Sequence, residues 1–188
     1  MNLYLVGYRC TGKTSVGGLL SHDLGWVFVD MDHQLAVEAG MPIQDIVASL
    51  GWQHFREIEG RLLERLGQTG KQVVATGGGA VTVKSNIAAM RTSGKVVWLQ
   101  ASPAVIAERM VEDRNTAGQR PPLRGEDAVA EIEEILGERL PLYKQAMHFR
   151  VNTDDLSPRE VADSILVWLK NTQSAEWRKR EMRERQLF

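Results

Sequence analysis

Cysteine is nearly absent from this chain, which has Cys10 as its single thiol among 188 residues. One thiol cannot form a disulfide within the chain, and this favours a reducing compartment. The sequence also lacks a basic segment followed by an apolar stretch of signal type at its start, and no apolar run approaches the roughly 20 residues that a membrane span needs. We therefore expect a cytoplasmic protein with no membrane partner.

An excess of charge of one sign is absent as well. Lysine and arginine number 23 against 24 aspartates and glutamates, which gives a formal net charge of −1. This balance predicts no nucleic-acid partner, and the four scattered histidines lack the Cys/His spacing of a zinc site. With 43% hydrophobic residues the chain can build a sizeable core, and its length predicts one compact domain.

Residues 7–14 have the G-x-x-x-x-G-K-[ST] pattern of a phosphate-binding loop. An apolar run precedes them and a helical pattern follows, which is the context that the motif requires; a chance match is the alternative. Glycines let consecutive N–H groups point at one anion, Lys13 would reach the β- and γ-phosphates, and the Thr14 hydroxyl would bind Mg²⁺. The residues expected around the nucleotide are Gly7, Arg9, Cys10, Thr11, Gly12, Lys13, Thr14 and Ser15.

Short apolar runs alternate with longer amphipathic segments along the rest of the chain. The runs are continuous and β-branched, which is typical of strands buried on both faces of a parallel sheet. The pattern predicts a three-layer α/β fold, with a five-stranded parallel sheet covered by helices on both faces. The expected strands are Leu3–Val6, Trp26–Val29, Gln72–Ala75, Val96–Leu99 and His148–Val151.

Acidic residues and glycines follow two of these strands, at the edge where such sheets bind ligands. Asp30 and Asp32 follow the second strand, and their spacing suggests separate roles: one on Mg²⁺ through water or on a proton, the other on a polar substrate. Helix capping is the alternative for either carboxylate. Gly77-Gly78-Gly79 follows the third strand, and three glycines in a row indicate close approach of substrate or phosphate rather than a simple turn.

The expected helices carry recognisable start and stop signals. Gly40 and Gly51 are expected to end helices. Pro141 should kink its helix or end it nearby. Ser157 with Glu160 forms a capping pattern at the start of a helix. The segments after residue 30 that we predict to be helical are 32–39, 42–50, 52–66, 127–144 and 157–170.

Arginines are placed at two points of interest. Arg56 and Glu59 share a helix face, and from the residues alone a surface ion pair is the simpler interpretation. The polar stretch 110–124 has lost the helical period and carries arginines at 114, 120 and 124. Such a stretch is typical of a lid, and a mobile cation that closes over a γ-phosphate would aid phosphoryl transfer; a solvated loop is the alternative.

Other classes of phosphate-loop protein are disfavoured by missing motifs. The Asn-Lys-x-Asp and Asp-x-x-Gly elements of GTPase switches do not occur, and neither does a dinucleotide-binding G-x-G-x-x-G. A small-molecule kinase is favoured. The alternatives are a non-catalytic nucleotide-binding module and, within the kinases, an enzyme that acts on another small metabolite such as gluconate.

In the order and spacing of its motifs, the sequence resembles the shikimate kinase family. The motifs that carry the resemblance keep the family's order and spacing from residue 1 to about 170: Gly7–Thr14, Asp30-x-Asp32, Phe55-Arg56-x-x-Glu59, Gly77-Gly78-Gly79, Arg120-Pro121 and Arg139-x-x-Leu142-Tyr143. The resemblance implies a P-loop kinase fold like that of the nucleoside monophosphate kinases. It also implies ATP- and Mg²⁺-dependent phosphorylation of the 3-hydroxyl of shikimate, in aromatic amino-acid biosynthesis, by a monomer.

The resemblance also implies a role for individual residues. Lys13, Asp32 and Arg120 would be catalytic, with Asp32 on the shikimate hydroxyls and Arg120 on the transferring phosphate. Asp30 would approach the metal through water, and Arg109 would stack on adenine. The residues that would contact shikimate are Asp32, Arg56, Gly78, Gly79 and Arg139, with Glu59 positioning the arginines.

The same resemblance suggests how the chain is divided. Residues 1–170 would form the kinase domain, with substrate-binding helices at about 31–62 and a lid at about 111–124. In the lid the chain reads Arg120-Pro121-Pro122-Leu123, whereas the family commonly has a single proline, and this could alter lid closure. Residues 171–188 form a charged tail outside the usual pattern, either an appended helix or a frayed end.

Overall fold

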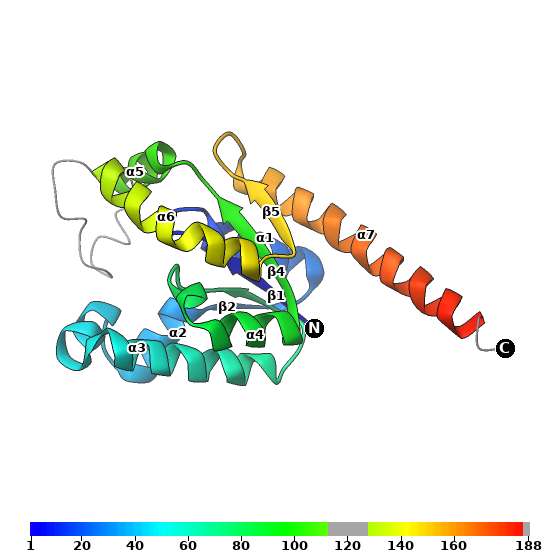
Figure 1. Ribbon diagram of the computed structural model, residues 1–188, viewed down its shortest axis with the longest axis horizontal. Helices are drawn as coiled ribbons and strands as arrows, with labels where there is room; N and C mark the ends of the chain where they lie inside the picture. Colours follow the sequence, from blue (N-terminus) through cyan, green and yellow to red (C-terminus); the bar gives the residue numbers. More distant parts are fainter. Residues whose placement is uncertain (113–127, 186–188) are drawn as a thin grey trace.

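The computed structural model describes the backbone of residues 1–112 and 128–185, and the side chains of residues 1–112 and 129–172. Strands and helices alternate along the described chain (Figure 1). The elements are β1 (Asn2–Val6), α1 (Lys13–Leu24), β2 (Val27–Asp30), α2 (Met31–Ala39), α3 (Ile43–Gly67), β3 (Gln72–Ala75), the short 3-10 helix η1 (Ala80–Thr82), α4 (Lys84–Ser93), β4 (Gly94–Gln100), α5 (Pro103–Glu112), α6 (Ala128–Ala146), β5 (Phe149–Asn152) and α7 (Pro158–Arg185).

The strands form one five-stranded parallel sheet in the order β2-β3-β1-β4-β5. This confirms the predicted α/β fold with a five-stranded parallel sheet. The central strand β1 pairs with β3 on one side and β4 on the other, so the direction of winding changes there. A sheet of this kind opens a crevice at the carboxyl end of the strand where the winding changes, and the phosphate loop follows β1.

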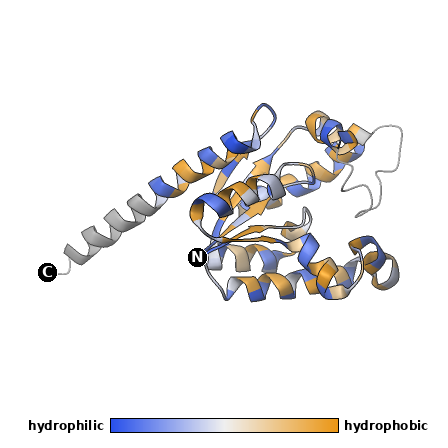
Figure 2. Cartoon of the chain, turned by 180° about the vertical axis from the view of Figure 1, so that it is seen from behind, coloured by the Kyte–Doolittle hydropathy of each residue, from blue (hydrophilic) through white to orange (hydrophobic). Residues whose placement is uncertain are grey.

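Alternate residues of β1 enter two separate cores, because successive side chains of a strand point to opposite faces. Leu3 and Leu5 pack with side chains of α1 and α7. Tyr4 and Val6 pack with side chains of α3, α4 and α6. Figure 2 shows the hydrophobic strands enclosed between helices of mixed character. The three layers follow from this alternation.

The edge strands differ from the prediction of strands buried on both faces. Val27 at the start of β2 is 62% exposed, and β2 has no fully buried residue. An edge strand has a neighbour on one side only, so helices cannot shield it as they shield β1. The predicted strand bounds lie within about two residues of the observed ones at each end.

The predicted helix stops are confirmed at both glycines, whereas Pro141 does not stop its helix at once. Gly40 caps α2 at φ 68°, and Gly51 breaks α3 at φ 83°, ψ 165°. Both residues lie in the left-handed φ region that only glycine adopts readily. Pro141 is inside α6, which continues to Ala146. In a helix, a proline ring crowds the carbonyl of the residue four positions earlier, and for Pro141 that residue is Gly137.

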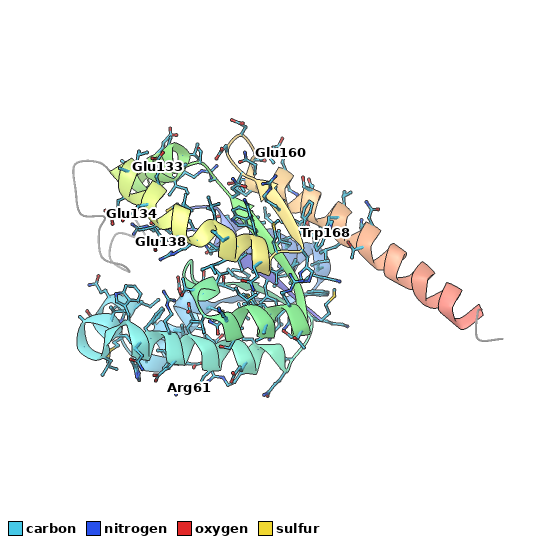
Figure 3. The ribbon with its side chains drawn as sticks, in the orientation of Figure 1. Arg61, Glu133, Glu134, Glu138, Glu160 and Trp168 are labelled. Carbon is cyan, nitrogen blue, oxygen red and sulfur yellow. The ribbon has the colours of Figure 1, made fainter. Side chains whose placement is uncertain are left out.

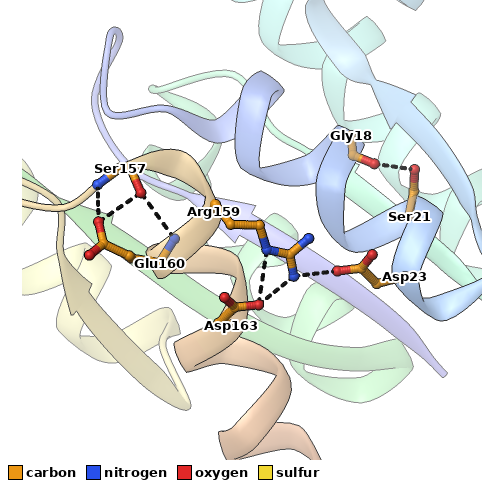
Figure 4. Close-up of polar contacts among 7 residues, drawn as sticks. All are labelled: Gly18, Ser21, Asp23, Ser157, Arg159, Glu160 and Asp163. Carbon is orange, nitrogen blue, oxygen red and sulfur yellow. Dashed lines mark hydrogen bonds and ion pairs between the residues drawn. The ribbon is translucent and has the colours of Figure 1, made fainter.

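Helix α7 begins at the predicted cap and extends beyond residue 170. The Ser157 N–H donates to Glu160 Oε2 at 2.8 Å, and the Glu160 N–H donates to the Ser157 hydroxyl at 3.3 Å, as a capping box requires (Figure 4). The Ser157 hydroxyl also donates to Glu160 Oε2 at 2.7 Å. Arg159 in the same turn pairs with Asp163 and, at 2.5 Å, with Asp23 of α1, which joins the two helices on this face. The helix runs unbroken to Arg185 and projects away from the rest of the molecule (Figure 1).

Ser157→Ala should lower the melting temperature by about 2–4 °C at neutral pH, because both hydrogen bonds between the Ser157 hydroxyl and Glu160 are lost. Hydrogen bonds from the Ser157 hydroxyl and N–H hold the pKa of Glu160 below its ordinary 4.5. A lowered pKa means that this stabilisation is present above the ordinary value and is lost as pH falls through the folded one. Thermal unfolding at pH 7 and pH 3 should therefore show a difference that shrinks in acid.

Ser164→Ala is the matched control, since Ser164 lies on the same helix and its hydroxyl donates to the Glu160 carbonyl rather than to the carboxylate. Its effect should be smaller and independent of pH. An equal Ser157→Ala effect at both pH values would contradict the assignment to the capping box.

None of the described helices combines the length and the apolarity needed to cross a bilayer.

Candidate functional site

A cavity of about 460 Å³ lies at the carboxyl end of the central strands, between the phosphate loop and the starts of α2 and α7. This is the size range of small-ligand sites. It brings together the phosphate loop, both predicted aspartates and Arg109. The lining residues are Arg9, Cys10, Thr11, Gly12, Lys13, Thr14, Ser15, Val16, Asp30, Asp32, Ala75, Thr76, Arg109, Glu112, Thr153, Leu156, Pro158 and Val161.

The phosphate loop has the backbone that its glycines predict. Gly7 and Gly12 have φ of 149° and 89°, and a Cβ on Gly7 would lie 2.3 Å from the carbonyl oxygen of Leu99 in β4. Gly7 is thus required both by its backbone angle and by its neighbour. Lys13 begins α1, and its ammonium group donates to the Tyr8 carbonyl at 2.7 Å, so that it folds back over the loop. The loop, its lysine and the helix N-terminus together form a site for an anion.

Asp30 is both a helix cap and part of the cavity wall. One carboxylate oxygen accepts hydrogen bonds from the N–H groups of Asp32 and His33, which begins α2. The other oxygen accepts from the Thr14 hydroxyl at 2.8 Å. The capping interpretation of Asp30 is therefore confirmed, and the same side chain also lines the cavity. The cap holds Asp30 against Thr14 at the mouth of the loop.

Asp32 and Arg109 reach the cavity from different elements. Asp32 lies in the first turn of α2 and is half-buried. The Arg109 guanidinium donates to the Thr153 carbonyl at 2.5 Å and to the Thr153 hydroxyl at 3.1 Å, so it ties α5 to the loop after β5. It also lies 3.5 Å from the Cys10 carbonyl. Arg109 therefore stands beside the phosphate loop, and its bonds to Thr153 fix its direction.

The glycine turn 77–79 stands directly beside the phosphate loop. A Cβ on Gly78 would lie 3.3 Å from the Gly7 carbonyl oxygen and 3.5 Å from the Arg9 nitrogen. A Cβ on Gly79 would lie 2.2 Å from a guanidinium nitrogen of Arg56. Close approach of backbone and side chains, rather than flexibility, is what these glycines allow.

Two arginines from different helices reach this turn. Arg56 of α3 lies against Gly79, and Arg139 of α6 donates to the Gly78 carbonyl in a long contact of 3.4 Å. The Arg139 guanidinium also lies 5.7 Å from the ring centroid of Tyr8, the second residue of the phosphate loop. The arginines and the turn thus form a cationic cluster adjoining the cavity. By contrast, Glu133, Glu134 and Glu138 of α6 and Arg61 of α3 are exposed (Figure 3).

The Arg56–Glu59 pair is not the surface ion pair that the residues alone suggested. Glu59 is fully buried, and its Oε2 accepts from Arg56 at 2.6 Å. The Arg56 guanidinium also lies beside the rings of Trp52 and Phe55, at 5.4 and 5.1 Å from their centroids. A carboxylate below and two rings beside the guanidinium hold its plane in place.

Thr153, which holds Arg109, and the aromatic residues of the site had no role predicted from the sequence. Tyr143 is fully buried, and its hydroxyl donates to the Gly78 carbonyl at 2.7 Å; Tyr8 lies under Arg139. Tyr143 stood in a motif string but carried no role, because nothing local to the sequence says where a buried hydroxyl points. Arg120 and most of the predicted lid lie outside the described residues.

A family model and individual relatives match this chain over most of its length. The family model described as shikimate kinase matches residues 9–170. Shikimate kinase 2 of Photorhabdus laumondii is 40% identical over 163 residues, which is 87% of this chain and 92% of the relative. The shikimate kinase of Thermodesulfovibrio yellowstonii is 39% identical over 88% of this chain and 92% of the relative.

Among solved structures, the shikimate kinase from Acinetobacter baumannii in complex with shikimate superposes with a TM-score of 0.83 at 34% identity. The match covers 90% of this chain and 93% of that one. The fold, the order of the motifs and these relatives agree, and the chain belongs to the shikimate kinase family.

Proposed function

We propose that this chain transfers the γ-phosphate of ATP to the 3-hydroxyl of shikimate, giving ADP and shikimate 3-phosphate, where the cavity meets the cationic cluster at the glycine turn. The relative from Acinetobacter baumannii was solved with shikimate bound. The observation that carries the proposal is the approach of Arg56 and Arg139 to one glycine turn that packs against the phosphate loop. This approach supports an organic-acid site next to a triphosphate site.

ATP would occupy the cavity with its phosphates on the loop. The backbone N–H groups of the loop and the start of α1 favour negative charge, and Lys13 would exchange its bond to the Tyr8 carbonyl for the β- and γ-phosphates. Arg109 lines the cavity together with Leu156 and Pro158, and the base would fit there between a guanidinium plane and apolar surface. The bonds from Arg109 to Thr153 keep that plane in place.

Mg²⁺ fits the oxygen donors at the mouth of the loop. Thr14 and Asp30 present a hydroxyl and a carboxylate oxygen 2.8 Å apart on the cavity wall. Among the described residues no group of three or more His, Cys, Asp and Glu could cage a metal ion. This suits Mg²⁺, which keeps several waters and binds through one or two protein oxygens and substrate phosphates. When bound, it would neutralise charge on the transferring phosphate.

Shikimate would bind through its carboxylate to the two arginines. A planar guanidinium fork matches a carboxylate in two parallel hydrogen bonds, and a second arginine fixes its direction. Glu59 and the neighbouring rings hold Arg56, while the Tyr8 ring and the Gly78 carbonyl hold Arg139. The backbone of Gly78 and Gly79 would contact the ring of the substrate from a side other than the one that faces Arg56 and the phosphate loop.

Asp32 would accept a hydrogen bond from the reacting hydroxyl and aim its oxygen at the γ-phosphate. Phosphoryl transfer needs little covalent help from protein, so alignment and charge stabilisation supply most of the rate. Lys13 would stabilise the charge on the phosphate, together with Arg120 from the segment outside the described residues. The remaining features we propose are a cytoplasmic monomer, a kinase domain that ends near residue 170, and a tail outside it.

ADP release measured with a coupled assay tests the function. With ATP and Mg²⁺, addition of shikimate should raise the rate by at least about 100-fold over the rate without acid, with kcat on the order of 1–100 s⁻¹. Gluconate in place of shikimate tests the alternative kinase and should give the background rate. If ATP binds but neither acid stimulates turnover, the chain is a nucleotide-binding module and the proposal fails.

A further inference from the structure

The carbonyl of Gly78 is bound from outside its own turn, unlike those of its two neighbours. The Gly77 carbonyl accepts from the N–H of Ala80, and the Gly79 carbonyl accepts from the N–H and the hydroxyl of Thr82, at 3.0 and 2.7 Å. The Gly78 carbonyl instead faces α6. It accepts there from the Tyr143 hydroxyl at 2.7 Å and from Arg139 at the longer distance of 3.4 Å.

Tyr143 is held rigidly behind the turn. Its side chain is fully buried, and its ring stacks on Trp98 of β4 with centroids 5.5 Å apart and planes 15° from parallel. A ring packed in this way has no freedom to follow a moving partner. Its hydroxyl is therefore a fixed point that joins the sheet and α6 to the peptide between Gly78 and Gly79.

The turn has no room for displacement toward its other neighbours. A Cβ on Gly78 would lie 3.3 Å from the backbone of the phosphate loop on one side, and a Cβ on Gly79 would lie 2.2 Å from the Arg56 guanidinium on the other. A rotation of the Gly78–Gly79 peptide would therefore change the seat of Arg56. It would also change the acceptor that Arg139 shares with Tyr143.

We propose that Tyr143 is a positioning residue for the organic-acid substrate: its hydroxyl locks the Gly78–Gly79 peptide and thereby sets the direction of Arg139. With the hydroxyl in place, the Gly78 carbonyl has a short neutral donor, and Arg139 keeps its hydrogen-bonding capacity for a carboxylate. Without it, the buried carbonyl would draw the Arg139 guanidinium inward, because an unsatisfied buried acceptor is costly. The inference rests on the proposed function, since it assigns Arg139 to the shikimate carboxylate.

Tyr143→Phe removes the hydroxyl and keeps the ring stacked on Trp98. We expect the KM for shikimate to rise about tenfold, from the loss of one buried hydrogen bond and the misdirection of Arg139. The KM for ATP should stay within a factor of two, because the phosphate loop and its lysine are unchanged. Titration calorimetry with shikimate in the absence of nucleotide should show the same loss of affinity.

Tyr4→Phe is the matched control. Tyr4 is also fully buried, and its hydroxyl bonds with Ser93 at 2.7 Å and accepts from Asn2 at 3.2 Å, all at the opposite end of the sheet from the cavity. The substitution is identical and removes a buried hydroxyl, so a purely structural effect would appear in both variants. Tyr4→Phe should leave both KM values unchanged. A shikimate KM that rises equally in the two variants, or in neither, overturns the proposal.

Trp98→Phe provides a second route if Tyr143→Phe does not fold. This variant keeps the Tyr143 hydroxyl but gives the Tyr143 ring a smaller aromatic ring to stack on. It should therefore raise the shikimate KM by about two- to fivefold. An unchanged shikimate KM in a folded Trp98→Phe variant would count against the proposal. Failure of the proposed function looks different, because the unsubstituted protein would then show no shikimate-dependent ADP release.

Discussion

Replacing Asp32 by asparagine should lower kcat by about a hundredfold or more while ATP binding stays near normal. The carboxylate lies in the first turn of α2 on the cavity wall, where it would accept a hydrogen bond from the reacting hydroxyl. An amide of the same shape accepts more weakly and carries no charge, and loss of an acid–base group typically costs a factor of about 10² to 10⁴. Steady-state kinetics at saturating ATP and shikimate measure the change.

Asp45→Asn is the matched control for this variant. Asp45 occupies the first turn of the next helix, α3, is exposed, and lies away from the cavity. It should retain the kcat of the unsubstituted protein. If Asp32→Asn also turned over at a near-normal rate, Asp32 would orient substrate without acting on the hydroxyl. If it lost ATP affinity instead, the role assigned to Asp32 would be wrong.

Replacing Arg139 by alanine should raise the KM for shikimate by about 10- to 100-fold and leave the KM for ATP nearly unchanged. The side chain stands between the glycine turn and the Tyr8 ring, where its fork would meet the substrate carboxylate. Removing one partner of a charge-assisted, bidentate pair accounts for a loss of this size. The two KM values are measured separately, each at saturation of the other substrate.

Arg139→Lys and Arg65→Ala are the comparison variants for Arg139→Ala. Lysine keeps the charge but loses the fork, so its KM for shikimate should fall between those of the unsubstituted protein and the alanine variant. Arg65 lies on α3 in an exposed pair with Glu38, and its loss should change neither KM. A defect of Arg139→Ala confined to ATP would show that the cationic cluster does not hold the acid.

The fold was largely predictable because its signals are local. Each strand is a short apolar run. The helical segments that stop at Gly40 and Gly51 do so because these glycines adopt the left-handed region. Ser157 caps α7, as its spacing with Glu160 predicts. The misjudged feature depends on neighbours. Val27 is exposed because β2 is an edge strand. The prediction for Pro141 was not wrong, since α6 ends nearby at Ala146.

The residues of the candidate site also fall into two groups, those with a local sequence signal and those whose role depends on tertiary neighbours. Residues with a local signal were identified from the sequence: Lys13 and Thr14 from the phosphate-loop motif, and Asp30 from its place at the end of a strand. The structure places all three around one cavity. Arg56 looked like half of a surface ion pair until burial of Glu59 was known. Only the resemblance to a family suggested a different role, since burial cannot be read from a three-residue spacing.

By itself the sequence determined the phosphate loop, the strands that precede each functional turn, and the type of ligand that the loop would hold, because all of these depend on residues a few positions apart. The tertiary structure alone decided which distant side chains meet. Arg139 and Tyr143 of α6 reach the Gly78 carbonyl across 61 and 65 residues of sequence, and Arg56 reaches Gly79 from a second helix, α3. Their convergence depends on strand order and on how α3 and α6 pack against the sheet, which is a property of the whole core and of no single segment.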